Sequence, residues 1–412
     1  MNTKKIFAML LALAMLLSLL SGCGQSEETA TDAGNAADSA GDAVDSTGDA
    51  QENENSFAEV DALAQAVEAA LAKARTSHDP DEVVCTIDGQ DVTWEMFYYL
   101  LSDELMTVIY YTGGLPEDYT KALTEEMTLE QYLKETTLAK AKYYVLAHTQ
   151  ALERDLSLSE EQEQEIEDYM THLVEQYGSE EALQEAMTES NLSSGLLRSL
   201  LRSNTELTAL MDSLYGAAGE KMSQEDVLNW AAEQGYIHIK HILYYNYNDD
   251  GTEMDEEGKA AQKEKAQAAL EELRAIQDNA VLAERFHEKM NADSGDVGGL
   301  MQFQNGYTFT SGTMFPVFEE AAFALEEYAL SEVVETQSGY HIILRLPLDT
   351  EDVTMNQDSN TGMYMTLRQS AANDLFSRDL AGWMEQAVVE WSGSFENLDL
   401  NELFGAAGSA EE

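Results

Sequence analysis

The chain has 412 residues and a formal net charge of −56, from 78 acidic and 22 basic side chains. So acidic a surface excludes binding to nucleic acid or to anionic lipid headgroups through charge, and it favours basic partners. The length is sufficient for two or three domains that each bury a hydrophobic core.

The first 22 residues have the parts of a secretory signal. Lys4 and Lys5 supply the positive start, and the apolar run 6–20 is too short for a comfortable membrane span. The following Leu20-Ser21-Gly22-Cys23 resembles a bacterial lipobox, which implies cleavage before Cys23 and a diacylglycerol on its sulfur. The alternative is an ordinary cleaved signal with an incidental cysteine. Two or more acyl chains would anchor the protein to the extracytoplasmic face of the cell membrane.

Residues 23–56 are predicted to form a disordered acidic tether, because the segment after Cys23 has neither aromatic nor basic residues up to position 55. The other cysteine, Cys85, lies in the apolar run 83–87 and is predicted to be a small buried residue rather than a nucleophile. No set of cysteines and histidines has the spacing of metal ligands, and we expect no cofactor.

Residues 57–235 are predicted to be mainly helical. An Ala-rich helix over 57–75 precedes a strand over 83–88 with a turn at Gly89, and Thr93 then caps a helix over 94–111. The Met and Tyr side chains of this helix are expected to form mostly packing core, with an adaptable peptide-binding surface as the alternative. The capping boxes Thr128-x-x-Gln131 and Ser159-x-x-Gln162 open helical patterns over 129–152 and 160–176. Two more helical patterns follow, a leucine-rich one over 192–214 and one over 224–233 that Ser223 caps.

Two short apolar runs that each contain a histidine delimit the central stretch. In the first, the two-residue period of a strand places Ile239 and His241 on one face and His238 on the other, which argues against a metal pair. In the second, His341 and Ile343 share a face. Two histidines on adjacent antiparallel strands can therefore meet across the sheet.

Helices are predicted between the two strands and after them. Two cover 255–277 and 281–290, the second packing Leu282, Phe286 and Met290, and a tight turn at Gly298-Gly299 precedes residues 300–303. The remaining predictions are a helix over 315–325 that buries Phe318, Ala322 and Leu325, a helix over 363–390 and a short terminal segment over 397–404.

These motifs, in this order, resemble the parvulin family of peptidyl-prolyl isomerases. The matching pieces are His241-Ile242-Leu243, then Asp293 at the end of a helix pair (an ungapped count would choose Asn291), part of the Gly298–Phe303 turn, Gly312-x-Met314-x-x-x-Phe318-Glu319-x-Ala321, and Thr336-x-x-Gly339-x-His341-Ile342-Ile343. The sequence departs from the pattern at Met301-Gln302 and in the long loop 304–311.

The resemblance implies an α+β fold in which a parvulin-like domain, a small antiparallel sheet flanked by helices, is inserted in a helical chaperone domain. The domains would be 57–235 (helical), 236–348 (parvulin-like) and 349–412 (a C-terminal helix that returns to the helical domain). The piece from Thr86 to Thr93 is similar to the entry of the chaperone domain in PrsA- and SurA-type foldases.

The resemblance also implies the site. An X–Pro bond rotates in tens to hundreds of seconds unaided, and an apolar cleft that favours the twisted amide accelerates it without a nucleophile or a metal. The implied catalytic residues are His241, Asp293, His341 and Thr336, and the implied substrate-binding residues are Leu300, Met301, Met314, Phe318 and Ser338.

Three functions are compatible with these observations. The first is an extracytoplasmic foldase that isomerises X–Pro bonds in unfolded or partly folded secreted proteins. The second is a holdase chaperone whose parvulin-like module is inert. The third is a solute-binding lipoprotein, which would need alternating strands and helices that the helical N-terminal half does not show.

Overall fold

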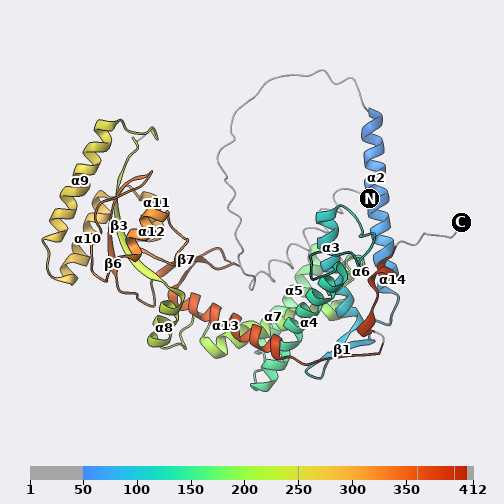
Figure 1. Ribbon diagram of the computed structural model, residues 1–412. Coiled ribbons are helices and arrows are strands. Elements are labelled where there is room, and N and C mark those ends of the chain that lie inside the picture. The colour runs from blue at the N-terminus through green and yellow to red at the C-terminus, as the bar shows by residue number, and fades with distance from the viewer. Residues whose placement is uncertain (1–49, 249, 360, 394, 406–412) are drawn as a thin grey trace. The chain divides into compact units, whose positions relative to one another are not determined.

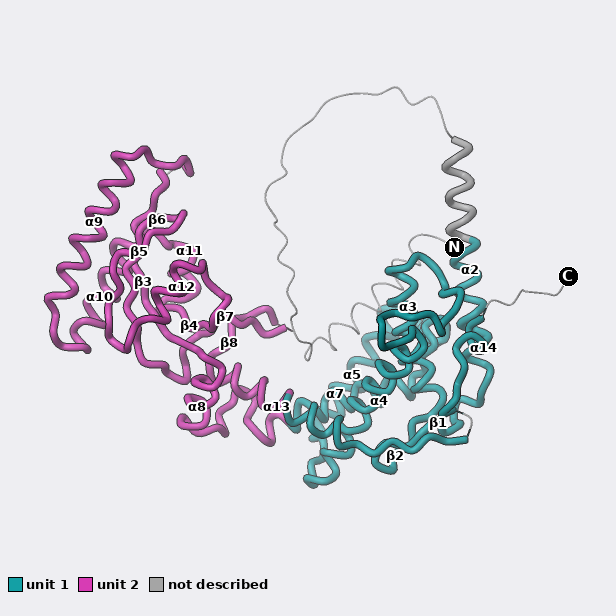
Figure 2. The backbone as a smooth tube through the Cα atoms, in the orientation of Figure 1, with its two compact units in different colours: residues 1–210, 378–412 teal, residues 211–377 magenta. Residues whose placement is uncertain are grey.

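The computed structural model describes residues 50–248, 250–359, 361–393 and 395–405 (Figure 1). These form two compact units, coloured separately in Figure 2. Unit 1 comprises the described residues up to Leu210 and those from Arg378 onward, and unit 2 comprises Met211–Ser377. Unit 2 is thus inserted in a mainly helical unit 1. The expected signal, the lipid site Cys23 and residues 23–49 of the expected tether lie outside the described residues. The predicted end of the tether at residue 56 is wrong, because a helix already begins at Ala50.

The local capping signals of unit 1 are confirmed. The side chain of Thr93 accepts from the backbone of Met96, and both predicted capping boxes form. The helix α6 was not predicted, and Ser179 caps it. The helices are α2 (Ala50–Arg75), α3 (Trp94–Thr112), α4 (Leu129–Glu153), α5 (Glu160–Tyr177), α6 (Glu180–Glu189) and α7 (Ser194–Tyr215), the last of which contains the border of the unit. In the described residues no helix is both long and apolar enough to span a membrane.

A three-stranded sheet joins the two ends of the described chain in unit 1. Its order is β2 (Gln90–Thr93), β1 (Val83–Ile87), β9 (Val389–Trp391). Cys85 is fully buried and lies opposite Trp391, so its prediction as a small core residue is confirmed. The helix predicted over 363–390 is too long at both ends, because α13 is Leu367–Gln386 and the residues after it pair with β1 instead.

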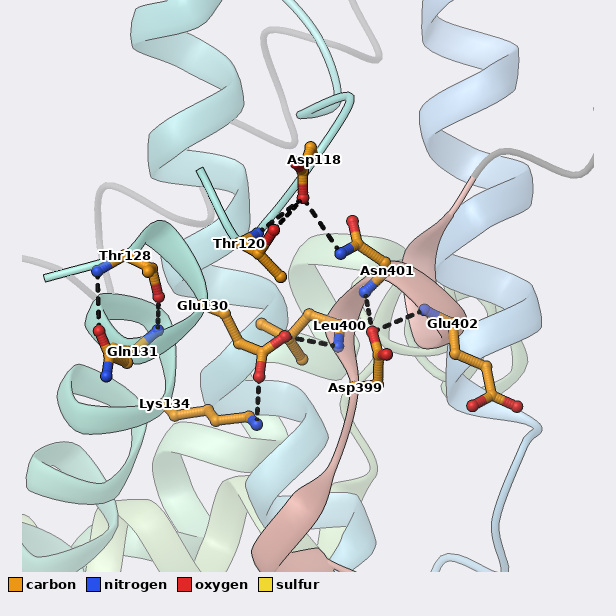
Figure 3. Close-up of polar contacts among 10 residues, drawn as sticks. All are labelled: Asp118, Thr120, Thr128, Glu130, Gln131, Lys134, Asp399, Leu400, Asn401 and Glu402. Carbon is orange, nitrogen blue, oxygen red and sulfur yellow. Dashed lines mark hydrogen bonds and ion pairs between the residues drawn. The ribbon is translucent and has the colours of Figure 1, made fainter. Parts of the chain in front are cut away.

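Polar contacts hold the C-terminal segment in unit 1 (Figure 3). The carboxylate of Glu130 accepts from the backbone of Leu400 at 3.2 Å and from Lys134 Nζ at 2.7 Å. Asn401 donates to Asp118 Oδ1 at 3.3 Å. The helix α14 (Leu400–Phe404), which follows a 3-10 turn over Phe395–Asn397, is therefore attached to α4 and to the loop before it.

Most of the Met and Tyr side chains of α3 pack in the core of unit 1, as expected from the sequence. Phe97 and Tyr98 are 1% exposed, and the Tyr98 hydroxyl donates to the carbonyl of Leu71 at 2.6 Å. Tyr110 and Tyr111 differ, since they are 72% and 81% exposed at the C-terminal end of the helix.

Unit 2 is built on a six-stranded sheet in which β3 and β6 form the long central antiparallel pair. The helices α9 (Glu256–Arg274) and α10 (Asn279–Asp293) cover one face of this pair, and α12 (Pro316–Phe323) packs on the other (Figure 1). The strand order is β5 (Val334–Glu335), β6 (Gly339–Leu346), β3 (Ile237–Tyr245), β4 (Tyr307–Phe309), β7 (Val353–Gln357) and β8 (Tyr364–Thr366), with β4 and β7 parallel.

Unit 2 is wider than the 236–348 span expected from the sequence. The helix α8 (Gln224–Gln234) packs on the first turns of α13 in a small core that includes Trp230 and Leu367. The indole of Trp230 also donates to Asp374 at 2.6 Å. These contacts join the two flanks of the central stretch to each other.

Candidate active site

The pairing of β3 with β6 brings two histidines together. His241 lies opposite Ile343 and His341 lies opposite Leu243, so the histidines are diagonal neighbours on one face. Their Nδ1 atoms are 3.2 Å apart, and the side chains are buried. The prediction that these histidines meet across the sheet is confirmed.

Each ring has a second partner on its outer nitrogen. Thr336 Oγ1 lies 2.9 Å from His341 Nε2, and Asp296 Oδ2 lies 2.9 Å from His241 Nε2. The turn that carries Asp296 is bonded to Leu243 in both directions, since Gly295 donates to its carbonyl at 2.7 Å and Ser294 Oγ accepts from its N–H at 3.1 Å. These bonds aim the Asp296 carboxylate at the histidine two residues before Leu243.

His341 and Asp296 have different charge states at neutral pH, and each has a physical cause. Burial, helped by the neighbouring His241, lowers the pKa of His341 to about 3. The hydrogen bond from His241, together with one from Tyr307, lowers the pKa of Asp296 to about 2 against the opposing effect of burial. At neutral pH, His341 is therefore neutral and Asp296 is ionised.

These partners fix the protons when both histidines are neutral. An ionised Asp296 only accepts, so His241 carries its proton on Nε2 and accepts on Nδ1. His341 then donates from Nδ1, and its Nε2 accepts from the hydroxyl of Thr336. That hydroxyl accepts in turn from the backbone N–H of Ser338 at 3.2 Å. We call this series of hydrogen bonds, from Ser338 to Asp296, the histidine chain. In each bond the acceptor is the group nearer to Asp296.

An apolar wall stands against the histidine chain. The ring of Phe318 meets both imidazoles edge-on, with centroids 5.3 Å from His241 and 5.1 Å from His341. Phe318 is buried, and Met314 packs partly exposed against the same cluster. Phe303 and Tyr307 belong to this cluster as well. A ring-sized apolar group that enters here would therefore meet a wall without formal charge.

The carboxylate of Glu319 explains how Met314 is held. It accepts from the backbone N–H groups of Gly312, Thr313 and Met314, at 2.8 to 3.3 Å. Gly312 has a φ of 91°, which favours glycine at this turn. The spacing of Gly312, Met314, Phe318 and Glu319 is thus a turn-and-helix unit that presents Met314 beside Phe318.

Comparisons with known proteins show the family of this domain. Residues 241–346 match the rotamase family, described as a PPIC-type PPIASE domain. The peptidyl-prolyl cis-trans isomerase Pin1 of Arabidopsis thaliana is 33% identical over 91 residues, which are 22% of this chain and 76% of that protein. The chain belongs to the parvulin family of peptidyl-prolyl cis-trans isomerases.

Similarity reaches beyond the parvulin domain. The foldase protein PrsA of Oceanobacillus iheyensis is 25% identical over 282 residues, which cover 68% of this chain and 73% of that protein. The protein is therefore PrsA-like over most of its length. The crystal structure of PrsA from Bacillus subtilis is 17% identical, and the match covers 69% of this chain and all of that one with a TM-score of 0.22.

The carboxylate that bonds to His241 is that of Asp296, whereas the sequence pattern predicted Asp293 for this place. Asp293 ends α10, where its side chain lies 3.3 Å from Lys289 Nζ and 3.4 Å from the Tyr244 hydroxyl. Neither contact leads to the histidine chain. A local signal for Asp296 existed, because it stands directly before the short helix α11 and caps it by accepting from Gly299 N–H at 3.2 Å.

The predicted Gly298-Gly299 turn is wrong, since both glycines lie within α11 (Val297–Gln302). This helix separates two predicted pocket residues from Phe318. Leu300 packs against the cluster under α9 and α10, and Met301 is 75% exposed. Met314 and Phe318 remain together, and Thr336 and Ser338 lie at the far end of the histidine chain.

Sequence reasoning also missed Tyr307. The long loop 304–311 contains the strand β4, and this strand places the Tyr307 hydroxyl on Asp296. Burial first, and the Asp296 carboxylate second, raise the pKa of Tyr307, so it stays a hydrogen-bond donor. Within the described residues, no cluster of three or more His, Cys, Asp or Glu side chains could hold a metal ion.

Proposed function

We propose that this protein is an extracytoplasmic foldase that isomerises X–Pro bonds in secreted proteins and holds unfolded chains while they fold. The observation that carries the proposal is the histidine chain against Phe318, since it offers shape and fixed polarity rather than a nucleophile. The similarity to a protein named foldase PrsA, which extends well outside the parvulin domain, supports the wider role.

The proposed mechanism favours the twisted amide over the planar one. Rotation about an X–Pro bond is slow because amide resonance keeps the bond planar. A cleft that grips the proline ring and excludes water disfavours the solvated planar amide, and so lowers the barrier. In this proposal Phe318 and Met314 grip the ring, while His241 and the neutral His341 form the floor of the cleft.

The remaining site residues have supporting roles in the proposal. Asp296 takes the place given to Asp293 from the sequence, and Thr336 with Ser338 terminates the histidine chain. Met301 is a rim residue, because its exposed side chain is free to cover a bound segment. Leu300 supports the rim, because its side chain packs against the apolar cluster between the sheet and the helices α9 and α10.

The proposed location rests on the sequence before residue 50, with Cys23 as the lipid site. Cys23→Ser should release the protein from membranes, because a net charge of −56 opposes electrostatic retention on anionic lipid. The measurement is the fraction that sediments with membranes after a high-salt wash. A variant that still sediments would refute the lipid anchor.

A non-catalytic holdase is the second candidate, and exposed apolar side chains favour it. Tyr110 and Tyr111 stand out from unit 1, and Met301, Phe315 and Val317 in unit 2 are 75%, 53% and 58% exposed. Such side chains can bind unfolded segments whether or not the parvulin site turns over.

One experiment separates the two functions. Cis–trans exchange of a short X–Pro peptide is measured by NMR with the purified protein, and aggregation of a denatured substrate is measured in parallel. The proposed foldase accelerates exchange and suppresses aggregation. If it suppresses aggregation but leaves the exchange rate at the uncatalysed value, the holdase replaces the proposal.

A further inference from the structure

Tyr307 has contacts that the family motifs do not account for. It lies in the long loop where this chain departs from the parvulin pattern, and it is 9% exposed. Its hydroxyl donates to Asp296 Oδ2 at 2.5 Å, the same oxygen that accepts from His241 Nε2. Its ring centroid lies 5.3 Å from that of His241 and 5.0 Å from that of Phe303. Such a short bond is typical of a hydroxyl that donates to a carboxylate.

The backbone of α11 is fitted to this contact. A Cβ atom on Gly299 would stand 1.6 Å from the Tyr307 hydroxyl oxygen and 2.4 Å from Asp296 Oδ2. Any side chain at position 299 would therefore displace one or both groups. The same residue donates its N–H to Asp296 Oδ1 at 3.2 Å. Gly299 thus leaves room for the hydroxyl and also binds the carboxylate.

We propose that Tyr307 is a positioning residue of the isomerase site, which keeps Asp296 ionised and aimed at His241 and so sets the direction of the histidine chain. The proposal deepens the proposed function and rests on it for the link to catalysis. Tyr307 acts through Asp296, and we assign it no contact with substrate.

The direction of the chain depends on the charge of Asp296. A protonated Asp296 would donate to His241 Nε2, and His241 would then donate from Nδ1 to His341. His341 would in turn carry its proton on Nε2 and donate to Thr336. Loss of the proton from one carboxyl therefore reverses every bond in the chain. The hydroxyl of Tyr307 opposes this reversal, because it stabilises the ionised form.

The groups that act on Asp296 come from four elements. His241 reaches it from β3 and Tyr307 from β4, and His341 on β6 acts on it through His241. From α11 itself, the N–H of Gly299 adds a donor. Removal of one hydroxyl should leave this set in place and weaken only the stabilisation of the carboxylate.

The test compares Tyr307→Phe with Tyr244→Phe in the complete protein. Both variants lose a hydroxyl that bonds to an aspartate in the same domain, but the partner of Tyr244 is Asp293, outside the histidine chain. The readouts are the pH profile of kcat/KM for an X–Pro peptide and the ring ¹⁵N signals of His241 on lowering the pH from 7.

We expect Tyr307→Phe to move the acid limb of kcat/KM to higher pH and to shift the ring signals of His241 at pH 7, because the Asp296 carboxylate loses one of the hydrogen bonds that stabilise its charge. At pH 7, kcat should fall about threefold to tenfold with KM little changed, because the carboxylate is less well aimed. Tyr244→Phe should match the unmodified protein in each readout. In an Asp296→Asn background, Tyr307→Phe should add no further change.

If Tyr307→Phe matches the Tyr244→Phe control in the pH profile and in the ring signals, the inference is overturned, while the proposed function is unaffected. A protein without isomerase activity would instead refute the proposed function. The ring signals would still decide whether Tyr307 sets the direction of the chain.

Discussion

Strand β3 carries two buried histidines on opposite faces, and each has a carboxylate and a threonine hydroxyl nearby. His241 bonds to Asp296 at 2.9 Å and belongs to the histidine chain that ends at Thr336. On the other face, His238 Nδ1 lies 2.8 Å from Thr308 Oγ1 and 3.4 Å from Asp352 Oδ2. The residue types are the same, but the two sites differ in the donors that reach the carboxylate.

The Asp296 carboxylate accepts hydrogen bonds from His241 Nε2, from the Tyr307 hydroxyl and from the N–H of Gly299, and its pKa falls to about 2. Asp352 accepts from the backbone of Asp349, and burial dominates, so its pKa rises to about 6. A histidine beside an aspartate is therefore not sufficient for a polarised chain. The number of donors on the carboxylate decides whether its pKa falls or rises.

The largest expected effect concerns the apolar wall beside His241 and His341. Phe318→Ala should cost about 3–5 kcal/mol of unfolding free energy and abolish most isomerase activity, because the wall beside the histidines is removed. Phe286, fully buried under α9 and α10, is the matched control. Phe286→Ala should cost similar stability and keep the activity of the folded fraction. Unfolding in denaturant measures the stability, and cis–trans exchange rates of an X–Pro peptide well below the melting temperature measure the activity. An equal loss of activity in both variants would contradict this prediction.

Next in size is the removal of a histidine from either face. His341→Ala and His238→Ala should each cost about 1–3 kcal/mol, because each leaves a buried partner unpaired. Only His341→Ala should also lower isomerase activity in the folded protein, since His238 is not in the histidine chain. An activity loss in His238→Ala as large as that in His341→Ala would remove the distinction between the two faces.

The pH dependence of stability sharpens the comparison. Burial lowers the pKa of His341 to about 3 and that of His238 to about 4, from an ordinary value of 6.5. The unfolded chain then binds more protons below pH 6.5, so this stability is present above pH 6.5 and is lost as the pH falls toward 4. The raised pKa of Asp352 has the opposite effect on stability between pH 3.8 and 6, but it is one group against the two histidines. Hydrogen exchange of β3 and β6 should accelerate on acidification, and flat protection from pH 7 to 4 would contradict the neutral histidines.

The smallest effect isolates the second carboxylate. Asp352→Asn should raise the unfolding free energy at pH 8 by about 1–2 kcal/mol, because an ionised group with a raised pKa no longer has to be buried. The gain should vanish near pH 4, where Asp352 is protonated in the folded protein. Asp296→Asn, the matched variant on the other face, should lower both stability and activity. A stabilised Asp296→Asn would reverse the assignment of the two carboxylates.

Local rules predicted much of this structure. The capping boxes at Thr128 and Ser159 form as expected, because each depends on residues three apart. The meeting of His241 and His341 followed from the two-residue period of strands. The insertion of the sheet unit in a helical one also follows from the order of the patterns.

The misses have a common physical origin in partners that are remote in sequence. Val389–Trp391 continues a helical pattern, yet it becomes β9 because the edge of β1 is available to it. The sequence pattern pointed to Asp293, with Asn291 as the ungapped alternative, and the bonds of Ser294 and Gly295 to Leu243 bring Asp296 to His241 instead. The role of Tyr307 depends on the fold of a loop that the family pattern does not describe.

The central claim is that the histidine chain is polarised toward an ionised Asp296 and forms the floor of the isomerase cleft. Ring ¹⁵N spectra of the histidines in the complete protein at pH 7, with and without a saturating X–Pro peptide, test it most directly. We predict a proton on Nε2 of His241 and on Nδ1 of His341, and peptide-induced shifts at both, with His238 unchanged. Opposite tautomers, a doubly protonated His341, or peptide shifts at His238 alone would contradict it.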